Sequence, residues 1–443
     1  MNRPGDGFEA ASPTPRVAGD SPELAAGKTV LAEVLSRGRV RGSVALLGPA
    51  FVASVAYIDP GNFATNFAAG AEYGYMLVWV IVMANLMAML VQYLTAKAGL
   101  ATGKSLPELC REAFGKGANI VLWIQAEIVA MATDLAEFVG AAVGLNLLFG
   151  IPLFPAGLIT AVVAFAILAL EQRGHRRFEL AIIALLGLVA GGFLYNFVAA
   201  GNQDPAGIAG GLVPQLDGTG SAALAVGIIG ATVMPHVVYL HSALQTRRIP
   251  AATPSERRTL LRANFWDCLI GLGIAGLINL SMLCIAAALF HSQGLTHVSE
   301  LELVYDNLGT LLGGGAALAF GVALLASGVS SSSVGTYAGQ VVMAGFMNWR
   351  ISLWLRRLIT MLPSLVILAL SVNTTDALVF SQIVLSFGIP FALVPLLLIT
   401  RKAAVMGDMA NRTVTNVAMT LITVIISSLN VYLLYATFAD MIG

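Results

Sequence analysis

Charged residues are scarce in this chain. Asp, Glu, Lys and Arg make up only 11% of its 443 residues, whereas hydrophobic residues make up 57%. About a quarter of the residues in soluble domains are charged, so this composition excludes an ordinary soluble protein and indicates an integral membrane protein. The formal net charge is zero. The chain therefore lacks the basic excess that would indicate a nucleic-acid partner.

Cysteine is also rare. The three cysteines, Cys110, Cys268 and Cys284, are scattered among apolar neighbours and indicate neither a disulfide framework nor a zinc site. The chain has no Gly-x-x-x-x-Gly-Lys-Ser/Thr loop, so we expect no bound nucleotide. It also shows no nucleophile–base pair of the kind that an enzyme would need. We therefore expect neither catalysis nor a cofactor.

The first 42 residues lack long apolar runs. They are rich in Pro, Gly, Ser, Ala and charge, which predicts a disordered tail at residues 1–42. No apolar core in this segment resembles a signal peptide. We expect a single transmembrane domain to follow at residues 43–437.

Apolar runs of membrane-spanning length dominate the rest of the chain. A transmembrane helix needs about 20 predominantly apolar residues, and this measure predicts an all-α protein with eleven spans. Their expected limits are 44–74, 76–100, 119–149, 153–171, 178–200, 221–245, 262–291, 309–346, 351–371, 376–400 and 413–437.

Basic residues alternate between the loops in step with these spans. The loops on the side of the tail contain Lys104, Lys116, Arg401 and Lys402, for example, whereas the loops on the other side contain no Lys or Arg. Basic loops stay in the cytoplasm. The expected location is the cell membrane, with a cytoplasmic N-terminus and an extracytoplasmic C-terminus.

Polar, proline-containing motifs interrupt the first and sixth spans. They read Asp59-Pro-Gly-Asn62 and Met234-Pro-His236. Interrupted helices at matching positions of two halves indicate a transporter's binding site. This pattern predicts a five-plus-five inverted repeat, with residues 43–200 and 221–400 as its halves and 413–437 as an added helix. A surface turn at the first motif and a core role for Met234 are the structural alternatives.

The two motifs offer ligands for a metal ion. Asp59 supplies a carboxylate, Asn62 an amide oxygen and Met234 a thioether sulfur. The prolines free backbone carbonyls just upstream, near Ala56 in the first span and at Ala231 in the sixth. Oxygen donors with one soft sulfur suit Mn²⁺, Fe²⁺ and Cd²⁺ better than Ca²⁺ or Mg²⁺.

The third span contains three carboxylates, Glu127, Asp134 and Glu137. They share one broad helix face over about 15 Å of rise. Carboxylates inside a span should face the bundle interior, where acid chains indicate proton relays. Static pairing with Arg356 or Arg357 is the alternative, and the two interpretations overlap because an arginine can tune a relay carboxylate.

Three further polar residues lie inside the predicted spans. His236 is expected to carry protons or orient the site, and His241 to line an inner cavity. The two histidines lie five residues apart, about 140° around a helix, so they cannot both face one ion. Gln382 in the tenth span is either a packing hydrogen bond or a metal ligand in some states.

These motifs together resemble the Nramp family of divalent metal transporters over residues 43 to the C-terminus. The similarity is greatest in the two interrupted motifs and in Ala132-Thr-Asp-Leu-Ala-Glu-Phe138, Gly174-His-Arg-Arg-Phe-Glu179, Tyr239-Leu-His-Ser242 and Gly335-Thr-Tyr-Ala-Gly-Gln340. The resemblance implies a LeuT-like fold and proton-coupled uptake of Mn²⁺ and Fe²⁺. Two positions depart from the family pattern, Val237 after the Met-Pro-His motif and Ala344 in the eighth span.

The resemblance also implies roles for individual residues. The metal ligands would be Asp59, Asn62, Met234, the carbonyls of Ala56 and Ala231 and, in some states, Gln382. The proton pathway would contain Asp59, Asp134, Glu137, His236, Glu127, Arg356 and Arg357. The expected partners are divalent metal ions, protons and the lipid bilayer, and nothing requires an oligomer.

Two other functions are compatible with membrane spans of this kind. An amino-acid symporter on the same fold would need to receive a substrate carboxylate, which Asp59 would repel. An intramembrane enzyme, or a sensor that has lost transport, would have its nearest cue in Asp134 and Glu137 close to His236. Uptake of a divalent transition metal by alternating access remains the main prediction.

Overall fold

The computed structural model describes residues 30–36, 38, 46–171, 175–201, 203–246, 249, 253–349 and 352–442. These residues form helices and connecting loops, without a β-strand anywhere in those ranges. The helices are α1 (Val30–Ser36), α3 (Pro49–Ala56), α4 (Pro60–Tyr73), α5 (Val78–Thr102), α6 (Leu106–Ala113), α7 (Lys116–Phe149), α8 (Leu153–Glu171), α9 (His175–Ala200), α10 (Pro205–Gly210), α11 (Gly218–Thr232), α12 (Pro235–Gln245), α13 (Pro254–Leu289), η1 (His291–Gln293), α14 (Leu301–Leu312), α15 (Gly314–Met347), α16 (Leu353–Ala369), α17 (Thr374–Thr400), α18 (Ala403–Met406), η2 (Gly407–Met409) and α19 (Thr413–Ile442).

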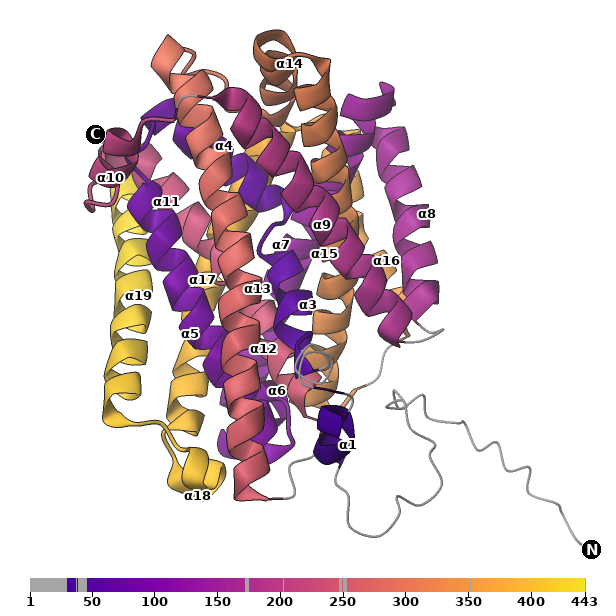
Figure 1. Cartoon of the computed structure of the whole chain (residues 1–443), viewed down its shortest axis with the longest axis vertical. Helices are drawn as coiled ribbons and strands as arrows, with labels where there is room; N and C mark the ends of the chain where they lie inside the picture. Colours follow the sequence, from indigo (N-terminus) through magenta and orange to yellow (C-terminus); the bar gives the residue numbers. More distant parts are fainter. Residues whose placement is uncertain are drawn as a thin grey trace, which may run out of the picture.

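Most of the long helices run along one direction and form a bundle (Figure 1). Helices α1, α6 and α18 lie at one end, whereas α10, α14 and the C-terminus lie at the other. The chain therefore crosses the bundle an odd number of times between α1 and its end. This agrees with eleven spans, and the exact number stays a prediction.

Eight helices in the described ranges are long and apolar enough to cross a membrane. The three other predicted spans correspond to the broken pair α3–α4, to α8, and to α16, which is 17 residues long. The predicted span 309–346 starts too early, because Gly313, with φ of 97°, separates α14 from α15. Only glycine adopts this backbone region readily, so the chain turns there before the span begins.

Part of the predicted tail is helical. Residues 30–36 form α1, and Leu31 is buried with 2% of its surface exposed. Leu31 and Val34, three residues apart and both at least partly buried, lie on one face of this helix, which accounts for the local order. The rest of the predicted tail, apart from residue 38, lies outside the described residues.

The two interrupted spans lie inside the bundle. Helix α4 packs against α13, α11, α17 and α7, and α3 packs against α13, α15 and α12. Most residues of α3, α4, α11 and α12 are buried. Broken backbone at membrane depth is tolerated only in such a position, away from lipid.

Candidate metal site and proton pathway

The first break separates α3 from α4 at Tyr57–Asp59. Pro60 has no backbone N–H, so the carbonyl of Ala56 loses the partner that a continuous helix would give it. The Asp59 side chain caps α4, because its Oδ1 accepts a 2.8 Å hydrogen bond from the backbone N–H of Asn62. Sequence alone therefore explains both the end of α3 and the start of α4.

Neighbouring helices fix the backbone of the first break. Asn279 Nδ2 of α13 donates a 2.8 Å hydrogen bond to the Tyr57 carbonyl. Ser327 Oγ of α15 donates to the carbonyl of Ile58. Within the described part of the chain, no hydrogen bond reaches the Ala56 carbonyl across the break. One backbone oxygen at this break is therefore available to a ligand.

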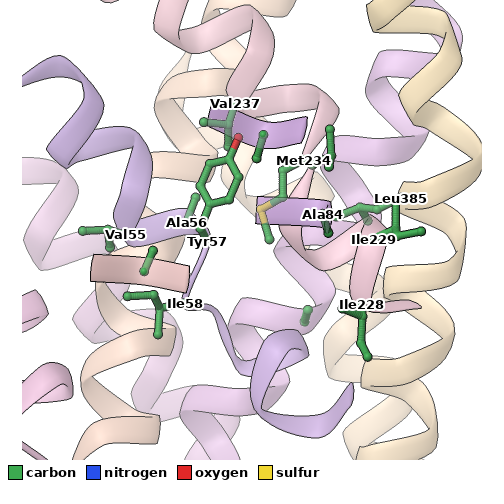
Figure 2. Packing of buried hydrophobic residues seen from close by; sticks show 14 of the residues in the cluster. Val55, Ala56, Tyr57, Ile58, Ala84, Ile228, Ile229, Met234, Val237 and Leu385 are labelled. Atoms are coloured by element: carbon green, nitrogen blue, oxygen red, sulfur yellow. The ribbon is translucent and has the colours of Figure 1, made fainter. Parts of the chain in front are cut away.

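The second break lies at Val233 and Met234, between α11 and α12. Pro235 cannot donate to the Ala231 carbonyl, and the Met234 side chain does not cap α12. Met234 is fully buried, and it belongs to the same buried cluster as Val55, Tyr57 and Val237 (Figure 2). Its thioether is thus placed in the interior of the bundle near both breaks.

Asn62 joins the two breaks directly. Its Nδ2 donates to Asp59 Oδ1 at 2.8 Å and to the Ala231 carbonyl at 3.1 Å. In contrast, Asp59 Oδ2 and Asn62 Oδ1 are buried without a hydrogen-bond partner among the described residues. Buried oxygens without partners are uncommon in folded proteins and need an explanation. A bound cation would supply the missing partner for Asp59 Oδ2, and also for Asn62 Oδ1 once the Asn62 amide turns toward it.

Gln382 of α17 lies against the first break. A Cβ atom placed on Gly61 would lie 1.9 Å from Gln382 Nε2, so only glycine allows this contact. Gln382 Nε2 donates to Ser381 Oγ at 3.0 Å, and its Oε1 is buried without a partner in the described ranges. The structure thus brings Gln382 to the other proposed ligands, with an oxygen still free.

The acidic residues of α7 differ in their partners. Glu127 forms a two-point ion pair with Arg356, at 2.7 and 3.2 Å. Asp134 Oδ1 lies 3.8 Å from Arg357 Nη1 without a hydrogen bond to it. Arg357 instead donates to Thr336 and Ser332 of α15. Both predicted pairings therefore exist, and only the pair of Glu127 and Arg356 is tight.

Glu137 is fully buried next to the first break. Its charged neighbours are Asp59, Asp134 and Arg357. A Cβ atom on Gly335 of α15 would lie 2.7 Å from Glu137 Oε2, so this glycine makes room for the carboxylate. The neighbours of Glu137 thus connect the first break to the acidic face of α7.

The two histidines of α12 have separate partners. His236 Nδ1 lies 3.1 Å from Thr133 Oγ1 of α7. His241 Nδ1 lies 2.9 Å from Gln92 Oε1 of α5, and Gln92 Nε2 donates to the Tyr57 hydroxyl at 2.5 Å. His236 is therefore next to the acidic helix, whereas His241 is linked to the end of α3. This agrees with their expected angular separation.

Sequence reasoning missed several polar residues that support the breaks. They are Asn279, Ser327 and Gln92, described above, and Asp267 of α13. Asp267 accepts hydrogen bonds from the backbone N–H groups of Gly48 (3.0 Å) and Ala50 (2.9 Å) at the start of α3. An Asp inside the predicted span 262–291 was the available signal. No group of three or more His, Cys, Asp or Glu side chains that could hold a metal ion occurs in the described segments.

Comparison with known proteins identifies the family of this chain. A family model described as "Natural resistance-associated macrophage protein-like", or Nramp, matches residues 50–436. The chain is 52% identical to the divalent metal cation transporter MntH of Deinococcus radiodurans, over 93% of this chain and 94% of that protein. It is also 52% identical to the MntH protein of Bacillus subtilis, over 90% and 93% of the two chains.

Solved structures give the same result for the fold. A crystal structure of a mutant manganese transporter from Eremococcus coleocola aligns with a TM-score of 0.81 and 33% identity, covering 91% of this chain and 89% of that one. The crystal structure of MhsT in complex with L-phenylalanine aligns with a TM-score of 0.61 at 13% identity, covering 88% of this chain and 98% of that one, and this likeness concerns the fold alone. The predicted LeuT-like fold is confirmed, and the chain belongs to the Nramp family of multi-pass membrane proteins.

Proposed function

We propose that this protein is a proton-coupled secondary transporter that imports divalent transition metals, Mn²⁺ and Fe²⁺ and also Cd²⁺. One observation supports this most: the amide of Asn62 connects Asp59 to the Ala231 carbonyl, so that ligands from both breaks converge. The names of the relatives, which describe divalent metal cation transporters, support the same class of substrate.

The proposed metal ligands are Asp59, Asn62, Met234, the carbonyls of Ala56 and Ala231, and Gln382 in some states. In the structure, the N–H groups of Asn62 interact with the oxygens that would surround the ion. Metal binding would require this amide to turn, so that its Oδ1 rather than its Nδ2 faces Asp59 and Ala231. Without the ion, the Asn62 amide N–H groups therefore donate to two of the oxygens that the cation would otherwise contact.

This set of ligands favours particular metals. Carboxylate, amide and carbonyl oxygens bind Mn²⁺ and Fe²⁺ well, and the Met234 sulfur adds affinity for softer ions such as Cd²⁺. Ca²⁺ and Mg²⁺ gain little from a thioether and prefer more oxygens or water. The site therefore selects transition metals by ligand chemistry.

Proton coupling would involve Asp59, Asp134, Glu137 and His236, with Glu127, Arg356 and Arg357 as supporting charges. A ligating carboxylate must be deprotonated, so metal binding at Asp59 releases or excludes a proton. Glu137 and Asp134 are the next acids along α7, and Arg357 lies beside Asp134 at 3.8 Å. These residues would accept the proton that the metal displaces.

Alternating access follows from the burial of the site. The side chains of Asp59, Asn62, Met234 and Gln382 are fully buried, so the ion cannot reach or leave them without movement of the surrounding helices. With the N-terminus in the cytoplasm and the C-terminus outside, an inside-negative potential favours entry by about 2.3 kcal/mol per charge per 100 mV. No nucleotide is needed to drive uptake.

The experiment is simultaneous measurement of Mn²⁺ entry and internal pH in proteoliposomes containing the wild-type protein or Met234→Ala. We expect Mn²⁺ entry with acidification for the wild type, no competition by amino acids, and altered metal selectivity in the variant. Mn²⁺ entry without any pH change would refute proton coupling. Competition by an amino acid would favour the alternative symporter.

A further inference from the structure

A groove of about 460 Å³ opens on the bundle surface between α7 and α17, at the end where α7 begins and α17 ends. Its lining is entirely apolar and includes Phe114, Ala118, Leu122, Pro390, Val394 and Leu398. This volume falls in the usual range for a binding pocket for small molecules. The groove lies outside the metal site and the proton pathway.

The two backbone carbonyls that the prolines in the wall of the groove leave without a helical partner both accept hydrogen bonds from neighbouring side chains. Pro390 and Pro395 of α17 cannot donate to the carbonyls of Ser386 and Phe391. Asn430 Nδ2 donates to the first at 2.9 Å, and the Tyr239 hydroxyl to the second at 3.5 Å. The prolines therefore shape α17 without leaving a polar group for water. Such a surface suits a hydrocarbon chain.

The end of the groove is basic. Lys116 lies between the lining residues Phe114 and Ala118, and Arg401 follows the lining residue Leu398 by about one helical turn. Lys116, Arg401 and the adjacent Lys402 are exposed, and their side chains make no ion pair or hydrogen bond within the described ranges. Nearby Lys104, in contrast, is already paired with Glu112 at 2.7 Å.

The start of α7 adds a second attraction for an anion. No side chain caps this helix, and its first turn contains no acidic residue. Its first backbone N–H groups are therefore available at the positive end of the helix dipole. A Cβ atom on Gly115 or Gly117 would meet nothing within 4 Å, so the space beside these groups is open. A phosphate group would fit there.

We propose that this groove binds an anionic phospholipid of the membrane. One acyl chain fills the apolar groove between α7 and α17, and the phosphate interacts with Lys116, Arg401 and the N-terminus of α7. Basic pockets between transmembrane helices on the cytoplasmic side are recognition sites for anionic lipid head groups. Because the groove opens at the basic end of the bundle, the lipid comes from the cytoplasmic leaflet of the proposed topology.

Native mass spectrometry of the full-length protein in detergent tests the proposal, with phosphatidylglycerol and phosphatidylcholine of identical acyl chains added in equal amounts. We expect preferential retention of phosphatidylglycerol. Lys116→Gln and Arg401→Gln should each reduce this preference about fivefold, as expected for one basic residue near a membrane surface. Arg257→Gln is the matched control, because Arg257 is also exposed but pairs with Asp408, and it should leave the preference unchanged.

A second pair of variants tests the acyl groove. Val394→Trp should fill the groove and reduce retention of both lipids, whereas Val198→Trp, on an exposed face of α9, should have no effect. Equal retention of the two lipids by the wild type would overturn the proposal. So would unchanged lipid preference in both charge variants, which alter only exposed side chains. A dimer that Val394→Trp disrupts would assign the groove to a second copy of the chain instead.

Discussion

The two interrupted spans differ in how they are held. At the first break, Asn279 and Ser327 fix two backbone carbonyls, and the Asp59 side chain caps the helix that follows. At the second break, no side chain caps α12, and the Ala231 carbonyl accepts a hydrogen bond from Asn62 of the first break. The first break is therefore built by the surrounding helices, whereas the second depends on the first.

This difference separates the two tasks of a metal site. A preorganised carboxylate provides most of the attraction for a dication, because its charge is buried and held in place. A thioether and a carbonyl on a less constrained segment instead determine which dication fits. Changes at the first break should thus affect affinity, and changes at the second should affect selectivity.

The largest expected effect is that of Asp59→Ala, which removes the only charged ligand of the proposed site. Mn²⁺ binding measured by calorimetry should be lost, corresponding to a decrease of at least about 100-fold in affinity. The control is Asp306→Ala, which removes an exposed carboxylate of α14. Retained Mn²⁺ affinity in Asp59→Ala would place the metal elsewhere.

The next effect tests whether neighbouring helices build the first break. Asn279→Ala removes the donor to the Tyr57 carbonyl and also the acceptor of Asn66 Nδ2, at 3.1 Å. An unsatisfied buried polar group costs about 1–3 kcal/mol, so Mn²⁺ affinity should fall about tenfold without a change of ligand.

Asn430→Ala is the control for this prediction. Asn430 also makes two buried hydrogen bonds, both with Ser386 of α17. Its Nδ2 donates to the Ser386 backbone carbonyl, and its Oδ1 accepts from the Ser386 hydroxyl. It should lower thermal stability while leaving Mn²⁺ affinity unchanged. If Asn279→Ala and Asn430→Ala reduce Mn²⁺ affinity equally, the hydrogen bond from Asn279 to the first break has no particular role in metal binding.

Much of this site could be predicted from the sequence, because proline and charge inside an apolar run have few structural explanations. Pro60 and Pro235 located both breaks, and the family resemblance indicated the fold. The supports were harder to predict, since Asn279 and Ser327 lie more than 200 residues from the carbonyls that they hold. Only the packing of α13 and α15 around α3 and α4 reveals these contacts.

The limits of the spans were predicted less well for a similar reason. Hydropathy cannot separate α14 from α15, because residues on both sides of Gly313 are apolar. The helix α1 inside the predicted tail was missed because it is only seven residues long. Short amphipathic segments form when a neighbour buries one face, which composition alone does not indicate.

At the second break, Met234→Ala should change selectivity more than affinity. Loss of the sulfur should reduce Cd²⁺ transport more than Mn²⁺ transport and should admit more Ca²⁺ or Mg²⁺. Competition among these ions for uptake into dye-loaded proteoliposomes measures the change. An unchanged order of ions would remove Met234 from the ligands and would make the second break a purely structural element.

The smallest effect on metal binding is expected for Asp134→Asn. Helix α7 contacts both breaks, because Gly140 packs against Pro60 and Thr133 bonds to His236. Asp134 itself has only a loose contact with Arg357. The asparagine amide of the variant has nearly the same shape as the carboxylate, so it should preserve the packing and leave Mn²⁺ affinity nearly unchanged. Proton flux measured with an internal pH dye should fall instead, because an amide cannot accept the proton that metal binding displaces.

Glu127→Gln gives the comparison that decides between a relay and static pairing. Glu127 accepts two hydrogen bonds from Arg356, so replacing its carboxylate with an amide should lower thermal stability as well as proton flux. If Asp134→Asn loses metal affinity and proton flux equally, Asp134 has a structural role like that of a static ion pair. If proton flux alone falls, the acidic face of α7 works with the first break as one proton-exchanging unit, and the second break only selects the ion.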